Sequence, residues 1–171
     1  MQKNKEVASR VKTYILDTNV YGELLIEKYG KEIIKKIIED SRIYIYGLDI
    51  IENELENTPI ELRYRNEILK KVVINIYESI IKEELKLVRI AKHLASEYYK
   101  KFDDLRKSGR YYNVLDQKIK KYTEEDLIVD FQIIAMASLK NIDIVVSADK
   151  RTILSRIQKE VFRWKIEIPL N

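Results

Sequence analysis

Four acidic residues in this chain stand where their carboxylates could hold a divalent cation: Asp17, Glu54, Asp130 and Asp149. Asp17 and Asp149 each close a short apolar run that is typical of a buried strand. A carboxylate that ends a buried strand lies at the carboxyl edge of the sheet, where open α/β folds bind their ligands. Clustered carboxylates repel one another unless a cation neutralises them, and hard oxygen ligands favour Mg²⁺ or Mn²⁺. Two such strands lying side by side would bring Asp17 and Asp149 together as ligands for Mg²⁺ or Mn²⁺, and Glu54 and Asp130 are the further candidate acids between them in the sequence.

The elements that must position these acids alternate between strand and helix at both ends of the chain. Apolar and β-branched runs predict strands at residues 13–20, 43–46 and 142–147, with an edge strand at 162–168. Helical spacing of apolar residues predicts one helix at 23–39, or two with the break at Gly30, and further helices at 49–57, 123–139 and 150–158. Such alternation predicts a parallel sheet with helices on its faces. Residues 60–121 are expected to be helical throughout, and this stretch is too long for one crossover.

The predicted fold class is therefore α/β, a three-layer α/β/α arrangement around a central parallel sheet. Residues 1–171 form one domain in this interpretation, and residues 60–121 form a long helical insertion. The insertion carries apolar residues at helical spacing, namely Ile68, Val72, Ile76 and Ile80. We expect a projecting helical arm to bury such a face against a second copy of the chain.

Composition narrows the chemistry. The chain has 171 residues, of which 46% are hydrophobic and 35% charged, with a formal net charge of +4. There are no cysteines, which excludes disulfides and thiol catalysis. The one histidine, His93, falls within a predicted helix, so a catalytic triad has no other imidazole to use. No signal peptide and no apolar run of about 20 residues is evident, so we expect a cytoplasmic protein without a membrane span.

Each acid also has a purely structural interpretation. Asp17 and Asp149 could cap the helices that follow them, because aspartate is favoured at that position. Glu54 lies among other acids on a short helix, and Glu52 is the alternative second acid. The metal site is the interpretation that explains all of these positions together.

The third acid has a competitor one helical turn away. Asp126 and Asp130 share a helix face, being four residues apart. Asp126 belongs to a capping-box sequence, 123–126, and so has a local structural role. Asp130 lies inside an otherwise apolar stretch, 127–137, where an ionisable group calls for a function. We therefore favour Asp130 and keep Asp126 as the alternative.

Basic residues offer contacts to phosphates. Lys150 and Arg151 follow Asp149 directly. A second group mixes cations with rings, as single-strand binders do, over residues 98–112. There we favour the structural interpretation, in which Tyr98, Tyr99 and Phe102 pack among the helices.

Taken together, these segments resemble a PIN-domain nuclease. The resemblance is carried by Leu16-Asp17-Thr18-Asn19-Val20, by Glu54-Leu55, by the Asp-x-x-Ile-x-Ala-x-Ala pattern from Asp130, and by the Ser-x-Asp that ends at Asp149. It covers residues 13–57 and 123–155, with all four segments in the family's order.

The resemblance implies that Asp17, Glu54, Asp130 and Asp149 bind the catalytic Mg²⁺ or Mn²⁺. It further implies that Asn19 and Ser147 hydrogen-bond beside the metal ligands and orient them, as such partners do. Within the family the chain is most similar to toxin ribonucleases of VapC type. That similarity implies a metal-dependent endoribonuclease with RNA as substrate, an antitoxin protein as partner, and a homodimer. The alternative is a non-catalytic PIN-like module that binds RNA or protein.

Overall fold

The central element of the structure is a four-stranded parallel sheet. The computed structural model describes residues 10–108 and 123–148. The strands are β1 (Lys12–Leu16), β2 (Ile43–Leu48), β5 (Glu83–Leu85) and β6 (Ile144–Val146), in the order β5-β2-β1-β6. Strand β1 lies between β2 and β6, with Tyr14 opposite Ile45 on one side and Ile144 on the other. The first and last described strands are therefore neighbours.

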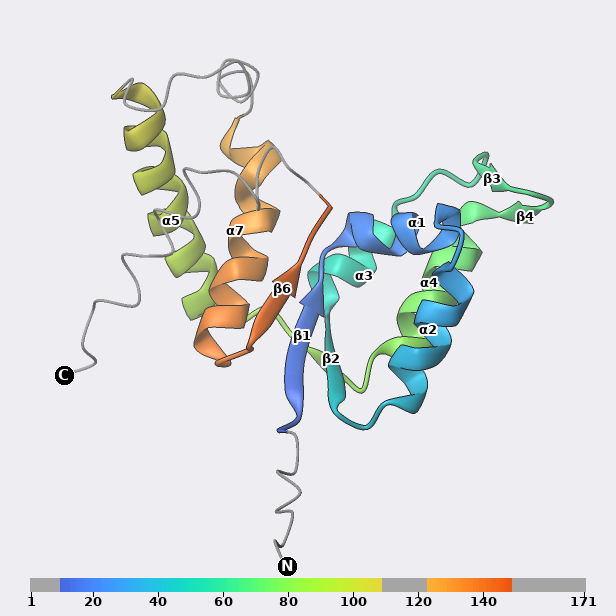
Figure 1. Ribbon diagram of the computed structural model, residues 1–171. Coiled ribbons are helices and arrows are strands. Elements are labelled where there is room, and N and C mark those ends of the chain that lie inside the picture. Colours follow the sequence, from blue (N-terminus) through green and yellow to red (C-terminus); the bar gives the residue numbers. More distant parts are fainter. Residues whose placement is uncertain (1–9, 109–122, 149–171) are drawn as a thin grey trace, which may run out of the picture.

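Helices cover both faces of this sheet, which gives three layers (Figure 1). One layer holds α1 (Thr18–Ile26), α2 (Gly30–Glu39), α3 (Asp49–Glu56) and α4 (Leu69–Ile80). The other holds α5 (Arg89–Lys107) and α7 (Glu124–Leu139), which pack side by side. The α/β class with a central parallel sheet is confirmed. No helix in the described ranges is both long enough and apolar enough to cross a membrane.

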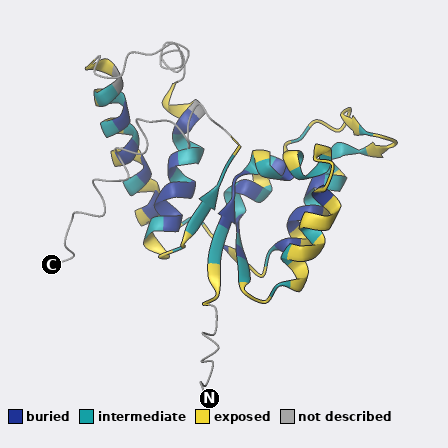
Figure 2. Ribbon diagram, in the orientation of Figure 1, coloured by how far each residue is buried: buried dark blue, intermediate teal, exposed yellow. Residues whose placement is uncertain are grey.

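Aromatic and small residues join α5 to α7. Ala91, Ala95, Tyr98 and Phe102 recur at helical spacing along α5, and all four are buried. The Phe102 ring meets the Phe131 ring of α7 at a centroid distance of 5.5 Å. The expectation that this aromatic group packs among the helices is therefore confirmed. Figure 2 shows where residues are buried and exposed: the buried residues face the sheet, and the outer side of α2 is exposed.

The stretch 60–121 differs from the expected all-helical insertion. It contains a small antiparallel hairpin, β3 (Arg63–Tyr64) with β4 (Glu67–Ile68), and the sheet strand β5. Helix α4 packs on the other helices of its layer, and its Ile76 and Ile80 are buried within the chain. The argument that these two residues need a second copy to cover them is therefore wrong. Residues 109–121 lie outside the described ranges.

Several element boundaries also differ from the expectation, and those of β1 and β2 bear on the site. Strand β1 ends at Leu16 rather than continuing to residue 20, because Asp17 turns the chain into α1. Strand β2 runs through Gly47 instead of ending there. An added Cβ at Gly47 would lie 2.3 Å from the Tyr77 hydroxyl, so glycine allows that close approach. The predicted break at Gly30, between α1 and α2, is confirmed.

Gly30 is fixed by a close backbone contact. A Cβ at this position would lie 1.8 Å from the carbonyl oxygen of Leu24, a backbone atom that cannot rotate away. Gly22, in the middle of α1, has no atom within 4 Å of its added Cβ. A side chain therefore cannot be accommodated at Gly30 without a backbone shift, whereas there is room for one at Gly22.

Tyr21 and Tyr77 are buried and pack against each other near the carboxyl edge of the sheet, with ring centroids 5.5 Å apart. The Tyr77 hydroxyl donates to the Leu48 carbonyl oxygen at 3.2 Å, and it also lies 3.3 Å from a Glu84 carboxylate oxygen. The Tyr21 hydroxyl has no hydrogen-bond partner among the described residues. Burial, and then the nearby charge of Asp17, raise the pKa of the Tyr21 phenol.

At the opposite, amino end of the sheet, Asp143 ties β6 to β1. Its Oδ2 accepts from the backbone N–H and from the hydroxyl of Thr13, each at 2.9 Å. These hydrogen bonds, backbone first, hold the pKa of the Asp143 carboxyl below its ordinary value of 3.8.

Candidate functional site

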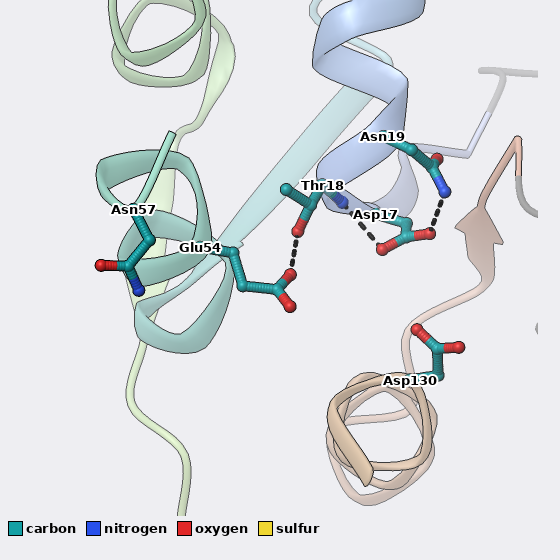
Figure 3. Close-up of a pocket in the computed structure, with 6 residues that line it drawn as sticks. All are labelled: Asp17, Thr18, Asn19, Glu54, Asn57 and Asp130. Atoms are coloured by element: carbon teal, nitrogen blue, oxygen red, sulfur yellow. Dashed lines mark hydrogen bonds between the residues drawn. The ribbon is translucent and has the colours of Figure 1, made fainter. Parts of the chain in front are cut away.

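A pocket of about 550 Å³ opens at the carboxyl edge of the sheet. Its lining comes from three separate parts of the chain: the β1–α1 junction, α3 and α7 (Figure 3). The lining residues are Asp17, Thr18, Asn19, Glu54, Asn57 and Asp130. All six are polar, and three are carboxylates, so the pocket concentrates negative charge and oxygen ligands.

Asp17 is the buried centre of this site, with 4% of its surface exposed. It lies between β1 and α1 and caps the helix, because its Oδ1 accepts from the Thr18 backbone N–H at 2.8 Å. Its Oδ2 accepts from Asn19 Nδ2 at 2.8 Å and from the Ser147 hydroxyl at 2.7 Å. The capping interpretation and the pocket interpretation of Asp17 are thus compatible, since one carboxylate does both.

Asn19 and Ser147 fix the orientation of that carboxylate. Asn19 uses both ends of its amide, because its Oδ1 accepts from the Ala148 backbone N–H at 3.0 Å while its Nδ2 donates to Asp17. The loop after β1 is therefore tied to the end of β6, across 129 residues of sequence. Buried charge is stable only with such partners.

Glu54 reaches the pocket from α3 and is partly buried. Its Oε2 accepts a short hydrogen bond from the Thr18 hydroxyl. Burial raises the pKa of the Glu54 carboxyl, the Thr18 bond lowers it, and the charge of Asp17 raises it, with a net upward shift. Glu52, the alternative second acid, does not line the pocket. Burial and the nearby Glu84 raise the pKa of Glu52 instead.

Asp130 faces the pocket from α7, on the opposite side from Glu54 (Figure 3). It is partly buried, and the residue that follows it, Phe131, is in the core. Asp126 lies one turn earlier on the same helix, and its side chain lies outside the described part of the structure. Asp149, Lys150 and Arg151 also lie outside the described residues, as do the helix expected at 150–158 and the strand expected at 162–168.

The pocket's donor set suits a hard divalent ion. Carboxylate, hydroxyl and amide oxygens are the ligands that Mg²⁺ and Mn²⁺ prefer. Over residues 10–108 and 123–148, no three His, Cys, Asp or Glu side chains are grouped closely enough to hold a metal ion as they lie. The three acids that line the pocket fit such an ion by chemical type.

Two pocket residues were not assigned a role from the sequence, Thr18 and Asn57. Thr18 lies inside the quoted Asp-Thr-Asn segment, but nothing in the sequence says which acid its hydroxyl meets. Asn57 follows Glu54 by three residues, and that helical spacing is the one signal that could have pointed to it.

Comparison with protein-family models, with curated proteins and with solved structures finds no match to this chain. The resemblance to PIN-domain nucleases therefore stays a prediction. It depends on the four sequence segments and on the geometry of the pocket.

Proposed function

We propose that this chain is a Mg²⁺- or Mn²⁺-dependent endoribonuclease with a PIN-like fold. One observation carries the proposal: carboxylates from the end of β1, from α3 and from α7 line a single pocket at the carboxyl edge of a parallel sheet. Acids that were only solvated surface charges or helix caps would have no reason to share a pocket. Ligands of open α/β sheets bind at this edge.

The residues around the pocket would hold the ion and the substrate in distinct ways. Asp17, Glu54 and Asp130, with Asp149 from outside the described ranges, would bind the ion. Asn19 and Ser147 would keep the Asp17 carboxylate in place through the two hydrogen bonds to its Oδ2. A bound divalent ion supplies an activated water and stabilises charge on the phosphate oxygens.

The charge of the pocket explains why an ion is needed before substrate. Three carboxylates repel a phosphodiester, and a partly buried acid such as Glu54 is costly to ionise without a cation nearby. His93 is exposed on α5 and does not line the pocket, so it is not the base. The ion would therefore both attract the phosphate and activate the nucleophile.

RNA as the substrate, an antitoxin protein as a partner and a homodimeric state are proposed from the sequence resemblance. Lys150 and Arg151, directly after Asp149, would contact the RNA backbone. The proposed assignment is closest to toxin ribonucleases of VapC type.

The test is cleavage of a labelled single-stranded RNA by the purified chain, with Mg²⁺ or Mn²⁺ and after chelation. We expect cutting only with the ion, and we expect Asp17→Asn and Asp130→Asn each to abolish it. The matched control is Asp143→Asn, the same chemical change at the other end of the sheet, which should cut like the parent.

Two outcomes would refute the proposal. One is an Asp17→Asn or Asp130→Asn variant that cuts at the parental rate with the ion present. The other is a parent chain that binds the RNA, with or without ion, and never cuts it. The second outcome would favour a non-catalytic RNA-binding module.

A further inference from the structure

Thr18 contacts two of the pocket's acids at once. Its backbone N–H donates to Asp17 Oδ1 at 2.8 Å, and its hydroxyl donates to Glu54 Oε2. It is the first residue of α1, whereas Glu54 lies on α3, 36 residues later. One side chain thus links the junction after β1 to the helix that follows β2.

The position of Thr18 in α1 explains why its hydroxyl is directed at α3. Backbone N–H groups at the start of a helix lack partners within the helix. Asp17 supplies the partner for the Thr18 N–H. The hydroxyl is therefore not needed as a cap, and in Figure 3 it points across the pocket to Glu54.

Glu54 is a side chain that gains from such a contact. A glutamate has three rotatable side-chain bonds, and fixing them costs side-chain conformational entropy. Threonine is stiff at its first side-chain bond because its Cβ is branched, so its hydroxyl is a well-placed donor.

We propose that Thr18 is a positioning residue that holds the Glu54 carboxylate toward the pocket, ready to bind the divalent ion. This inference rests on the proposed metal-dependent function. The hydroxyl would act through Glu54 alone, because the contact of Thr18 with Asp17 uses its backbone and survives any side-chain change.

The test is calorimetric titration of the full chain with Mn²⁺, without RNA. Thr18→Val keeps the side-chain shape and removes the hydroxyl. We expect it to weaken Mn²⁺ binding about tenfold, the effect of losing one hydrogen bond to a charged group. Thr18→Ser keeps the hydroxyl and should bind within about threefold of the parent. The matched control is Thr58→Val, just beyond α3 and not a pocket residue, which should bind like the parent.

Making Thr18→Val in a protein that already carries Glu54→Ala tests whether Thr18 acts through Glu54. Glu54→Ala removes the carboxylate that Thr18 is proposed to hold, so adding Thr18→Val to it should weaken Mn²⁺ binding no further. The inference is overturned if Thr18→Val binds like the parent, if Thr18→Ser is as impaired as Thr18→Val, or if Thr18→Val has its full effect without Glu54.

Denaturant unfolding in a chelator separates this inference from the proposed function. It is measured for the parent, Thr18→Val, Glu54→Ala and the variant that carries both changes. A parent chain that binds no Mn²⁺ refutes the metal site. In that case the unfolding cycle still decides the contact. Effects of Thr18→Val and Glu54→Ala that do not add support the link between the two side chains, and strictly additive effects overturn it.

Discussion

Replacing Asp17 by asparagine should lower the free energy of unfolding of the metal-free protein by about 1–3 kcal/mol. The variant removes a negative charge from an acidic pocket, so relief of repulsion alone would predict the opposite sign. The hydrogen bonds decide the outcome, because Asp17 is 4% exposed and accepts from Thr18, Asn19 and Ser147 within the described part of the chain.

The magnitude follows from where the new amide NH₂ can go. In one orientation it faces the Thr18 backbone N–H, and in the other it faces the Asn19 NH₂ and the Ser147 hydroxyl. The Ser147 hydroxyl can rotate to accept a hydrogen bond. Asn19 cannot flip without losing its bond from the Ala148 N–H. Either orientation therefore sets donor against donor, and an unsatisfied buried donor costs about 1–3 kcal/mol.

The opposing repulsion is the smaller effect. Among the causes that shift the pKa of Glu54, the charge of Asp17 ranks behind burial and behind the Thr18 hydrogen bond. Removing that charge should lower the pKa of Glu54, and NMR titration of the Glu54 carboxyl would measure the shift. It should not compensate for the lost hydrogen bonds to Asp17.

The assay is denaturant unfolding at pH 7 with a chelator present. Ser147→Ala is the matched control, because it removes one donor from the same carboxylate oxygen and leaves the charge in place. It should cost about 0.5–1.5 kcal/mol. An Asp17→Asn variant as stable as the parent, or more stable, would refute the reasoning, because repulsion would then outweigh the hydrogen bonds.

Three further predictions concern stability. Asp143 should stabilise the folded state fully above its ordinary pKa of 3.8 and lose this effect as the pH falls below that value, because folding lowers its pKa. Acid titration followed by circular dichroism should therefore show a shallower loss of stability for Asp143→Asn than for the parent. Gly30→Ala should lower the free energy of unfolding by about 3 kcal/mol, because the new Cβ would clash with the Leu24 carbonyl oxygen, whereas Gly22→Ala should raise it by about 0.5–1 kcal/mol. Equal effects of the two variants in denaturant unfolding would contradict this prediction. Tyr21→Phe should raise the melting temperature, because it removes a buried hydroxyl that has no partner among the described residues, whereas Tyr77→Phe should lower it by removing a hydrogen bond. A change of the same sign in both variants would count against the hydrogen-bond argument.

Features that depend on local sequence could be predicted. Asp17 was recognisable as a candidate site residue because it closes an apolar run, although the strand itself was expected to continue to residue 20. The break at Gly30 was recognisable because glycine interrupts a helical pattern. Asp130 was identifiable because a charge stands within an apolar helix. In each case the signal lies within a few residues of the feature.

Features that depend on distant pairing could not be predicted. Strand β5 has three residues, Glu83–Leu85, two of them charged, so its sequence carries no strand pattern, and its place in the sheet depends on pairing with β2. The β3–β4 hairpin turns at Arg65, which has a φ of 54° without the glycine that usually marks such a turn. The Thr18–Glu54 hydrogen bond likewise depends on how α1 and α3 pack.

The pairing of β1 with β6 has a consequence for biosynthesis. Ser147 and Ala148 complete the hydrogen bonds around Asp17 and Asn19, and they are made about 130 residues after them. Contacts of such high sequence separation form late in folding, after the loop between them has closed. A growing chain on the ribosome therefore carries Asp17 through about 130 further residues of synthesis without two of the partners around its carboxylate. The hydrogen-bonded arrangement around Asp17 can therefore form only after Ser147 and Ala148 have been made.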